Sequence, residues 1–185
     1  ENLPDSTWSF VETRTVVKGG QTGNSADLSF YDAYGEYQDT LAVKGMVMVI
    51  SVYNQKMKTK WRTTASFISR VEDAGFRPLL LVSASAQQME SVFQKYPEQA
   101  EVLKRVLYYS DYKTLMAMNR SNGGVTYFSD GYLVRKWASG NCPDTAELNE
   151  IYIGDDTEVI IESDSRGRLA FQGFLLYVFA IMLLL

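Results

Sequence analysis

Four basic side chains crowd the start of a predicted helix, and they are the first candidates for binding chemistry. They are Lys56, Lys58, Lys60 and Arg62. A helix N-terminus already carries positive partial charge, so each exposed cation there costs about 0.3 to 1 kcal/mol. One explanation is a basic surface whose side chains extend into water. The functional explanation is that the turn receives an anionic group, either acidic residues of a partner or lipid headgroups.

Nucleophilic catalysis has one candidate. Cys142 is the only cysteine, so no intrachain disulfide can form, and the chain has no histidine, which excludes imidazole catalysis and histidine metal ligands. Cys142 follows the last predicted strand, beside Pro143 and far along the chain from the basic turn. We interpret Cys142 as a small structural residue, and the alternative is the nucleophile of a one-cysteine peroxidase.

Acidic pairs and a glycine-rich turn offer two further possibilities. Asp155 with Asp156, and Glu158 with Glu162, lack the spacing of a calcium loop, so a solvated charge run explains them better. The Ser-Asn-Gly-Gly segment at 121–124 could hold an anion on its backbone amides, but a turn that enters a hairpin is the ordinary explanation. We therefore predict no metal site and no cofactor.

The basic turn lies inside the segment that organises the chain, residues 44–85. Residues 46–53 form a nearly continuous apolar run, which is typical of a strand buried on both faces of a sheet. A second apolar run follows at 78–83. Between them, apolar residues at spacings of four, three and three predict one face of a helix that ends at Gly75. That face consists of Trp61, Ala65, Ile68 and Val71. Strand, helix and strand in this order predict a parallel pair.

Capping residues, prolines and turns place the other elements. Further helices are predicted from the cap Ser85 to the breaker Pro97, over 98–105, over 112–118, and from Asp144, with capping-box spacing to Glu147, to residue 151. Further strands are predicted at 106–110, 125–128 and 132–137, the last two joined by an Asp-Gly turn. Before the core we predict an edge strand at 8–17, or a segment there that simply lies against the core, then a loop at 18–25 and a hairpin at 27–38.

The resulting order, β-α-β-α-β-α-β-β-α over about residues 28–153, resembles the TlpA and peroxiredoxin branch of the thioredoxin-like fold. The resemblance implies an α/β three-layer sandwich with a mixed central sheet. In that family the turn after the first core strand carries a Cys-x-x-Cys pair, and a cis-proline precedes the strand that faces it. Here the turn reads Tyr-Asn-Gln-Lys-Met-Lys at 53–58, and the facing stretch reads Asn-Gly-Gly-Val-Thr at 122–126. Both halves of the redox site are missing.

We therefore predict that the former redox surface now serves for binding. The predicted binding residues are Tyr53, Asn54, Lys56, Lys58, Lys60, Arg62, Gly124 and Val125.

A second apolar feature is the uncharged run at 169–185, which a polar connector at 154–168 separates from the predicted 27–153 domain and its 1–26 lead-in. Its length is at the lower limit for a spanning helix. We predict a transmembrane helix that contacts the lipid bilayer, and the alternative is a buried helix of a larger core. Arg166 and Arg168 would place the domain in the cytoplasm by the positive-inside rule, whereas the TlpA-like resemblance implies the periplasm, which we favour.

The run at 114–137, with the Pro-Asp helix and the apolar segment after it, resembles the thioredoxin-like region attached to DoxX-type bacterial membrane proteins. This resemblance implies an inner-membrane location and a membrane or periplasmic protein partner. Since the first residue is Glu, we expect the chain to be either a processed product or a fragment of a longer protein, and we favour the fragment.

Composition excludes one class of function. With 46% hydrophobic residues the chain can bury a core, and with a net charge of -4 it lacks the basic excess that nucleic-acid binding needs. Our leading hypothesis is a redox-inactive thioredoxin-like binding or positioning module at a bacterial membrane. The alternatives are a membrane-tethered oxidoreductase or one-cysteine peroxidase that uses Cys142, and a structural spacer within a membrane complex.

Overall fold

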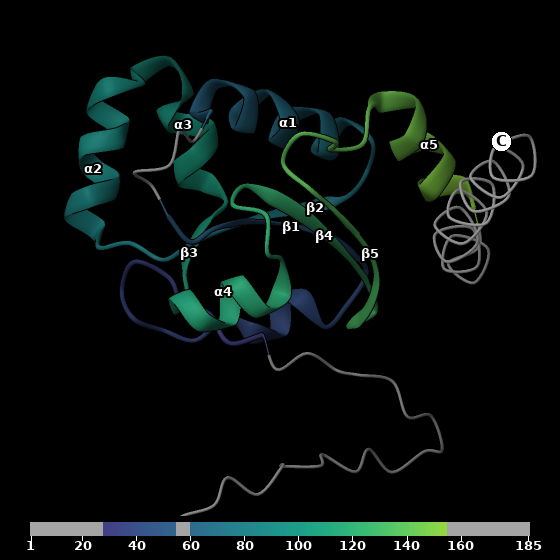
Figure 1. Cartoon of the computed structure of the whole chain (residues 1–185), viewed down its shortest axis with the longest axis horizontal. Helices are drawn as coiled ribbons and strands as arrows, with labels where there is room; N and C mark the ends of the chain where they lie inside the picture. The colour runs from purple at the N-terminus through teal and green to yellow at the C-terminus, as the bar shows by residue number, and fades with distance from the viewer. Residues whose placement is uncertain (1–27, 55–59, 155–185) are drawn as a thin grey trace, which may run out of the picture.

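The computed structural model describes residues 28–54 and 60–154. Several predictions lie outside these ranges: the edge strand at 8–17, the loop at 18–25, Lys56 and Lys58, the two acidic pairs, the connector and the helix at 169–185. Within the described ranges, a mixed five-stranded sheet carries helices on both faces (Figure 1). The predicted α/β class and the mixed central sheet are confirmed.

The strand order of the sheet is β3-β2-β1-β4-β5. The strands are β1 (Met46–Val52), β2 (Arg77–Val82), β3 (Leu107–Tyr109), β4 (Gly124–Ser129) and β5 (Tyr132–Trp137). The central strand β1 pairs in parallel with β2 and antiparallel with β4, so that Ile50 lies opposite Leu80 on one side and Val125 on the other. The predicted parallel pair is confirmed, and β4 brings residues from far along the chain beside β1.

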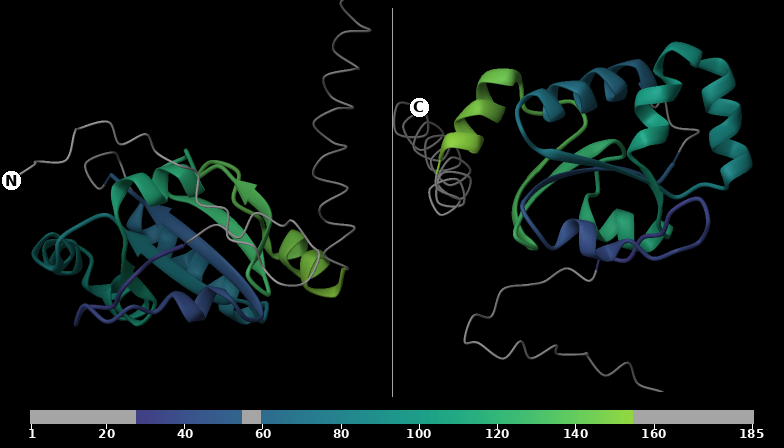
Figure 2. Two further views of the ribbon diagram at one scale, coloured as in Figure 1. Left: turned by 90° about the horizontal axis from the view of Figure 1, so that it is seen from below. Right: turned by 180° about the vertical axis from the view of Figure 1, so that it is seen from behind.

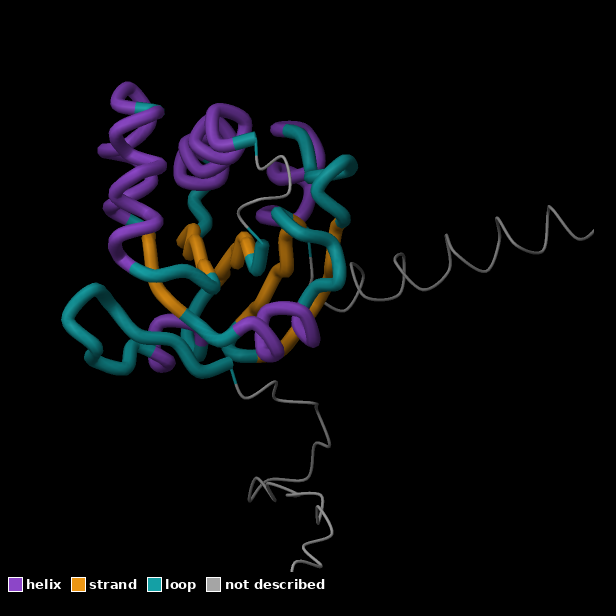
Figure 3. Tube along the Cα trace, turned by 60° about the vertical axis from the view of Figure 1, so that its left-hand side comes forward, coloured by secondary structure: helices purple, strands orange, loops and turns teal. Residues whose placement is uncertain are grey.

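Each face of the sheet is covered by its own set of helices, as the views in Figures 1 and 2 show. One face carries α1 (Trp61–Asp73), α2 (Ala86–Lys95), α3 (Pro97–Arg105) and α5 (Thr145–Ile153). The other face carries α4 (Tyr112–Met118) and the 3-10 helix η1 (Asp39–Ala42). Alternation along β1 supplies both cores, because Met48 and Ile50 face the α1 side while Val47 and Val49 face the α4 side. The layered arrangement is visible end-on in Figure 3.

Side-chain caps begin three of the helices. The Ser85 side chain accepts from the backbone N–H of Gln88, and the Gln88 side chain accepts from the backbone N–H of Ser85. These two bonds form a capping box for α2. Asp111 caps α4 and Asp144 caps α5. The carboxylate of Glu147 instead accepts from the indole of Trp137 at 3.2 Å and pairs with Arg135 at 2.9 Å, so it ties α5 to β5.

The predicted hairpin at 27–38 keeps its turn but does not form two strands in the described part. Tyr31 makes a single bridge to Tyr37 and a second bridge to Tyr109 on β3. The Asp32 carboxylate accepts from the backbone N–H groups of Tyr34 and Glu36 at 2.8 and 3.1 Å, and two backbone bonds, from Asp32 to Glu36 and from Gln38 to Phe30, join the limbs of the turn. The segment therefore extends the sheet edge instead of standing apart from it.

None of the helices in the described ranges is long and apolar enough to span a bilayer.

Candidate functional site

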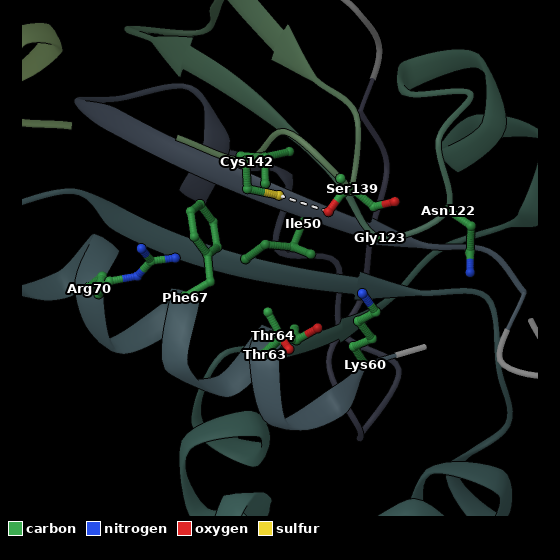
Figure 4. Close-up of a pocket in the computed structure, with 12 residues that line it drawn as sticks. Ile50, Lys60, Thr63, Thr64, Phe67, Arg70, Asn122, Gly123, Ser139 and Cys142 are labelled. Atoms are coloured by element: carbon green, nitrogen blue, oxygen red, sulfur yellow. Dashed lines mark hydrogen bonds between the residues drawn. The ribbon is translucent and has the colours of Figure 1, made fainter. Parts of the chain in front are cut away.

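A pocket of about 310 Å³ extends along α1, from Lys60 at the start of the helix to Arg70 in its last turn (Figure 4). One wall is a stripe of α1, a second wall is the loop before β4, and the third is the loop after β5. The lining residues are Lys60, Thr63, Thr64, Phe67 and Arg70 from the helix side, Asn122 and Gly123 before β4, Ser139, Gly140 and Cys142 after β5, and Ile50 and Val125 from the strands. The pocket thus joins three segments that are far apart in the sequence.

The helix wall begins with Lys60, which occupies the N-cap position of α1. Its side chain makes no capping hydrogen bond, although Ser, Thr, Asp and Asn are the residues that usually stabilise this position. The stripe continues through the adjacent residues Thr63 and Thr64 to Phe67 and Arg70, and each of these lies three or four positions from another member, which is one face of a helix. A cation at the N-cap opposes the helix dipole, so Lys60 lowers the stability of α1.

The floor of the pocket is apolar. Ile50 of β1, Val125 of β4 and Phe67 of α1 are all buried. The guanidinium of Arg70 lies over the Phe67 ring, 5.5 Å from its centroid. This contact holds Arg70 along the pocket wall, because the face of an aromatic ring attracts a cation.

Hydrogen bonds fix the loop before β4 against the end of β1. The backbone N–H of Asn54 donates to Oδ1 of Asn122 at 2.9 Å, and Nδ2 of Asn122 donates to the carbonyl of Asn54 at 2.8 Å. The backbone N–H of Ser139 donates to Oγ of Ser121 at 2.9 Å, which joins this loop to the one after β5. The two loops are therefore connected to each other and to the central strand.

Although Cys142 is far along the chain from the basic turn, its thiol lies in the pocket that Lys60 also lines. Its Sγ is 3.7 Å from the carbonyl oxygens of Ala138 and Ser139, to which it can donate. Burial raises the pKa of the thiol above its ordinary value, and the nearby charge of Arg70 opposes the shift without cancelling it. The thiol is therefore protonated at neutral pH, which disfavours nucleophilic attack.

Of the predicted binding residues, Lys60 and Val125 line the pocket. Arg62, two positions after Lys60, is exposed and is not part of the lining. Asn54 contributes through its bonds to Asn122. Lys56 and Lys58 fall outside the described residues.

Tyr53 and Gly124 hold the surroundings of the pocket together. The Tyr53 hydroxyl donates to the carbonyl of Arg120, and its ring meets that of Tyr112 edge-on at 5.5 Å. Gly124 is buried beneath the amide of Asn119. Both residues are near the site, but neither lines the cavity.

Sequence reasoning missed Thr63, Thr64, Arg70 and Ser139. The helical spacing that places Thr63, Thr64 and Arg70 on the same face as Lys60 was available in the sequence. Nothing in the local sequence indicates that Ser139 and Cys142 meet that face, because their placement depends on the β1–β4–β5 pairing.

The described residues contain no group of His, Cys, Asp and Glu side chains that could hold a metal ion. The pocket instead presents hydroxyl groups, one carboxamide, one thiol and two cations, over an apolar floor. Such a lining can bind and orient an anionic ligand, because it supplies charge-assisted hydrogen-bond donors beside apolar contact area.

No protein-family model matches the sequence, and a search of curated proteins finds no significant match. Among solved structures, the chain is similar to the exposed lipoprotein thioredoxin of Streptococcus pneumoniae (13% identity, TM-score 0.46, covering 69% of this chain and 98% of that one). It is also similar to a putative electron transfer protein of Aquifex aeolicus (13% identity, TM-score 0.49, covering 70% of this chain and 96% of that one). A third similar structure is the mitochondrial 2-Cys peroxiredoxin of Plasmodium falciparum (12% identity, TM-score 0.40, covering 78% of this chain and 91% of that one). At TM-scores below 0.5, these likenesses say nothing about activity.

Proposed function

We propose that this chain is a thioredoxin-like binding module without thiol-disulfide activity, and that the pocket between α1, β4 and β5 is its binding site. The observation that carries the proposal is the content of the pocket. The lining follows the helix that comes after the turn at 53–58, and it has two cations, Lys60 at the start of that helix and Arg70 in its last turn, with one thiol whose pKa is raised by burial. These groups support binding and do not support electron exchange.

The chemistry of exchange supports the same proposal. Reduction of a disulfide proceeds through attack by a thiolate and release by a second thiol. The chain contains one cysteine, so no second thiol of its own can resolve a mixed disulfide. The raised pKa of Cys142 lowers the fraction of thiolate available for the first step.

The test is an assay of insulin reduction with dithiothreitol and of peroxide consumption, with wild type and Cys142→Ser. We expect neither protein to exceed the rate of the reductant alone. Turnover by wild type that Cys142→Ser abolishes would overturn the proposal. A two-cysteine thioredoxin at the same concentration serves as the positive control.

The second candidate function is an oxidoreductase or one-cysteine peroxidase that uses Cys142. One observation favours it: the thiol faces the pocket, and the charge of Arg70 acts to lower its pKa. Burial outweighs that charge, which is why we place binding first. The assay above separates the two functions.

We also propose that the module belongs to a DoxX-like bacterial membrane protein, with residues 169–185 as the tether in the inner membrane and the domain on the periplasmic side. The uncharged, apolar sequence of that segment supports the tether. The full chain should then require detergent, while a chain that ends at residue 154 should be soluble and melt cooperatively, because the described core is complete by Ile153. Aggregation of the truncated chain would show that the segment belongs to the core.

Two further experiments test on which side of the membrane the domain lies and which partner it binds. In spheroplasts, added protease should cleave a periplasmic domain, and resistance until lysis would place the domain in the cytoplasm. Purification of the full chain in mild detergent should retain the proposed membrane or periplasmic partner. Loss of that partner when a bulky side chain fills the pocket, as in Thr64→Trp, would assign the contact to this site.

A further inference from the structure

The two cations of the pocket lie at its opposite ends along α1 (Figure 4). Lys60 and Arg70 are ten positions apart, which at the rise of an α-helix separates their Cα atoms by about 15 Å. Neither side chain forms an ion pair with an acidic residue within the described ranges, where the paired cations are Lys104, Arg105 and Arg135. Both charges are therefore available to a ligand.

The space between the cations is apolar at the bottom and polar at the rim. Phe67, Ile50 and Val125 form the floor, and all three are buried. The hydroxyl-bearing residues Thr63 and Ser139 line the pocket and are themselves exposed, which places them toward its mouth. A ligand that fits this lining has charge at its ends and an apolar middle.

We propose that the pocket binds an elongated small molecule with a carboxylate at each end and an aliphatic chain between them, one carboxylate at Lys60 and the other at Arg70. This inference rests on the proposed binding function and names its ligand class. A volume of about 310 Å³ is at the small end of ligand sites and suits one such molecule. The two cations of the lining would neutralise both charges of such a dianion.

Length dependence is the first test. The full chain, in a nonionic detergent, is titrated by calorimetry with succinate, adipate, azelate and dodecanedioate. Azelate or dodecanedioate should bind tightest, because succinate is too short to reach both cations. Monomethyl azelate, which has one charge, should bind about tenfold more weakly than azelate, the factor expected for one lost charge-assisted hydrogen bond. Equal affinity for azelate and its monoester would overturn the proposal.

Variants of the two cations give the second test. Lys60→Gln and Arg70→Gln should each lower the affinity for azelate about tenfold and remove its advantage over the monoester. The control Arg62→Gln removes the same charge from an exposed neighbour outside the pocket and should leave both affinities unchanged. Arg70→Lys, which keeps the charge, should retain the preference for the diacid. If Arg70 had only a structural role, Arg70→Gln would lower the affinities for azelate and for its monoester by the same factor. That result would also overturn the proposal.

Cys142 provides a readout inside the pocket, since it is the only thiol of the chain and part of the lining. Saturating azelate should slow its alkylation by iodoacetamide, and monomethyl azelate at the same concentration should slow it less. Unchanged alkylation with bound azelate would place the ligand elsewhere and reject the site. Absence of azelate binding rejects only the ligand class, whereas thiol-dependent turnover in the insulin or peroxide assay rejects the binding function itself.

Discussion

The side-chain amide of Asn119 packs directly against Gly124, where a Cβ would stand 2.7 Å from both of its terminal atoms. Nδ2 of Asn119 donates to the carbonyls of Val125 at 3.1 Å and Trp137 at 3.0 Å, and Oδ1 accepts from the N–H of Ser121 at 3.0 Å. One buried amide thus connects α4, the loop that lines the pocket, and both antiparallel strands. Glycine at 124 is what allows it to lie there.

Gly124→Ala should destabilise the fold by about 1 to 3 kcal/mol, the usual cost of forcing extra volume into a packed interior. Urea unfolding followed by fluorescence measures the change. Gly140→Ala is the matched control, because no atom lies within 4 Å of a Cβ at that position. If both variants unfold at the same urea concentration, the close contact between residue 124 and Asn119 does not affect the free energy of unfolding.

Asn119→Ala should cost about 1 to 3 kcal/mol for each buried carbonyl that it leaves without a donor. Combined with Gly124→Ala, the loss should be smaller than the sum of the two single losses, because removal of the amide makes room for the new methyl group. The same unfolding assay measures all three variants. Strict additivity would argue that the two residues do not act on each other.

Ile68→Ala should cost about 2 to 5 kcal/mol, because Ile68 has no exposed surface and belongs to the core between α1 and the sheet. Ser66→Ala, at an exposed position of the same helix, is the control and should change stability little. A loss below about 0.5 kcal/mol for Ile68→Ala would be typical of a surface substitution and would mean that the helix face has been misread.

Lys60→Asp should stabilise the protein by about 1 kcal/mol, since it provides a side-chain acceptor at the N-cap of α1 and replaces a cation at the positive end of the helix. Thermal unfolding measures the gain. Ser85→Asp, at an N-cap that already has its capping bond, should give no comparable gain. The same Lys60→Asp variant should lose azelate binding, so stability and binding change in opposite directions. A loss of stability would mean that Lys60 has a structural role.

Asp111 should make α4 sensitive to acid. Hydrogen bonds from the side chain and the N–H of Thr114, and from the N–H of Lys113, hold the pKa of this carboxyl below its ordinary value of 3.8, although burial acts in the opposite direction. Because the folded pKa is lowered, the contribution of Asp111 is present above the unfolded pKa and is lost as the pH falls through the folded pKa. Asp111→Ala should therefore cost about 1 kcal/mol at neutral pH, and the difference from wild type should vanish in acid. A difference that persists in acid would contradict this assignment.

Local patterns were sufficient for most of the elements. The apolar run of β1, the spacing of Trp61, Ala65 and Ile68 on α1, and the Asp-Gly turn between β4 and β5 each depend on residues close together in the chain. The period of the apolar residues indicates a strand or a helix, and the turn residues indicate a hairpin. The segment at 27–38 is different, because Tyr31 pairs with Tyr109, a partner no local pattern could indicate.

The pocket was decided by the tertiary structure. Antiparallel pairing of β1 with β4 brings Asn122 beside Asn54, and the loop after β5 then carries Cys142 to the face of α1 that holds Lys60 and Arg70. The sequence determined which side chains α1 presents on one face, since helical spacing alone sets that. It could not determine which residues lie opposite that face. Contacts between segments about seventy residues apart depend on how the strands pair and on burial of both faces of the sheet. Both conditions are met only in the folded chain.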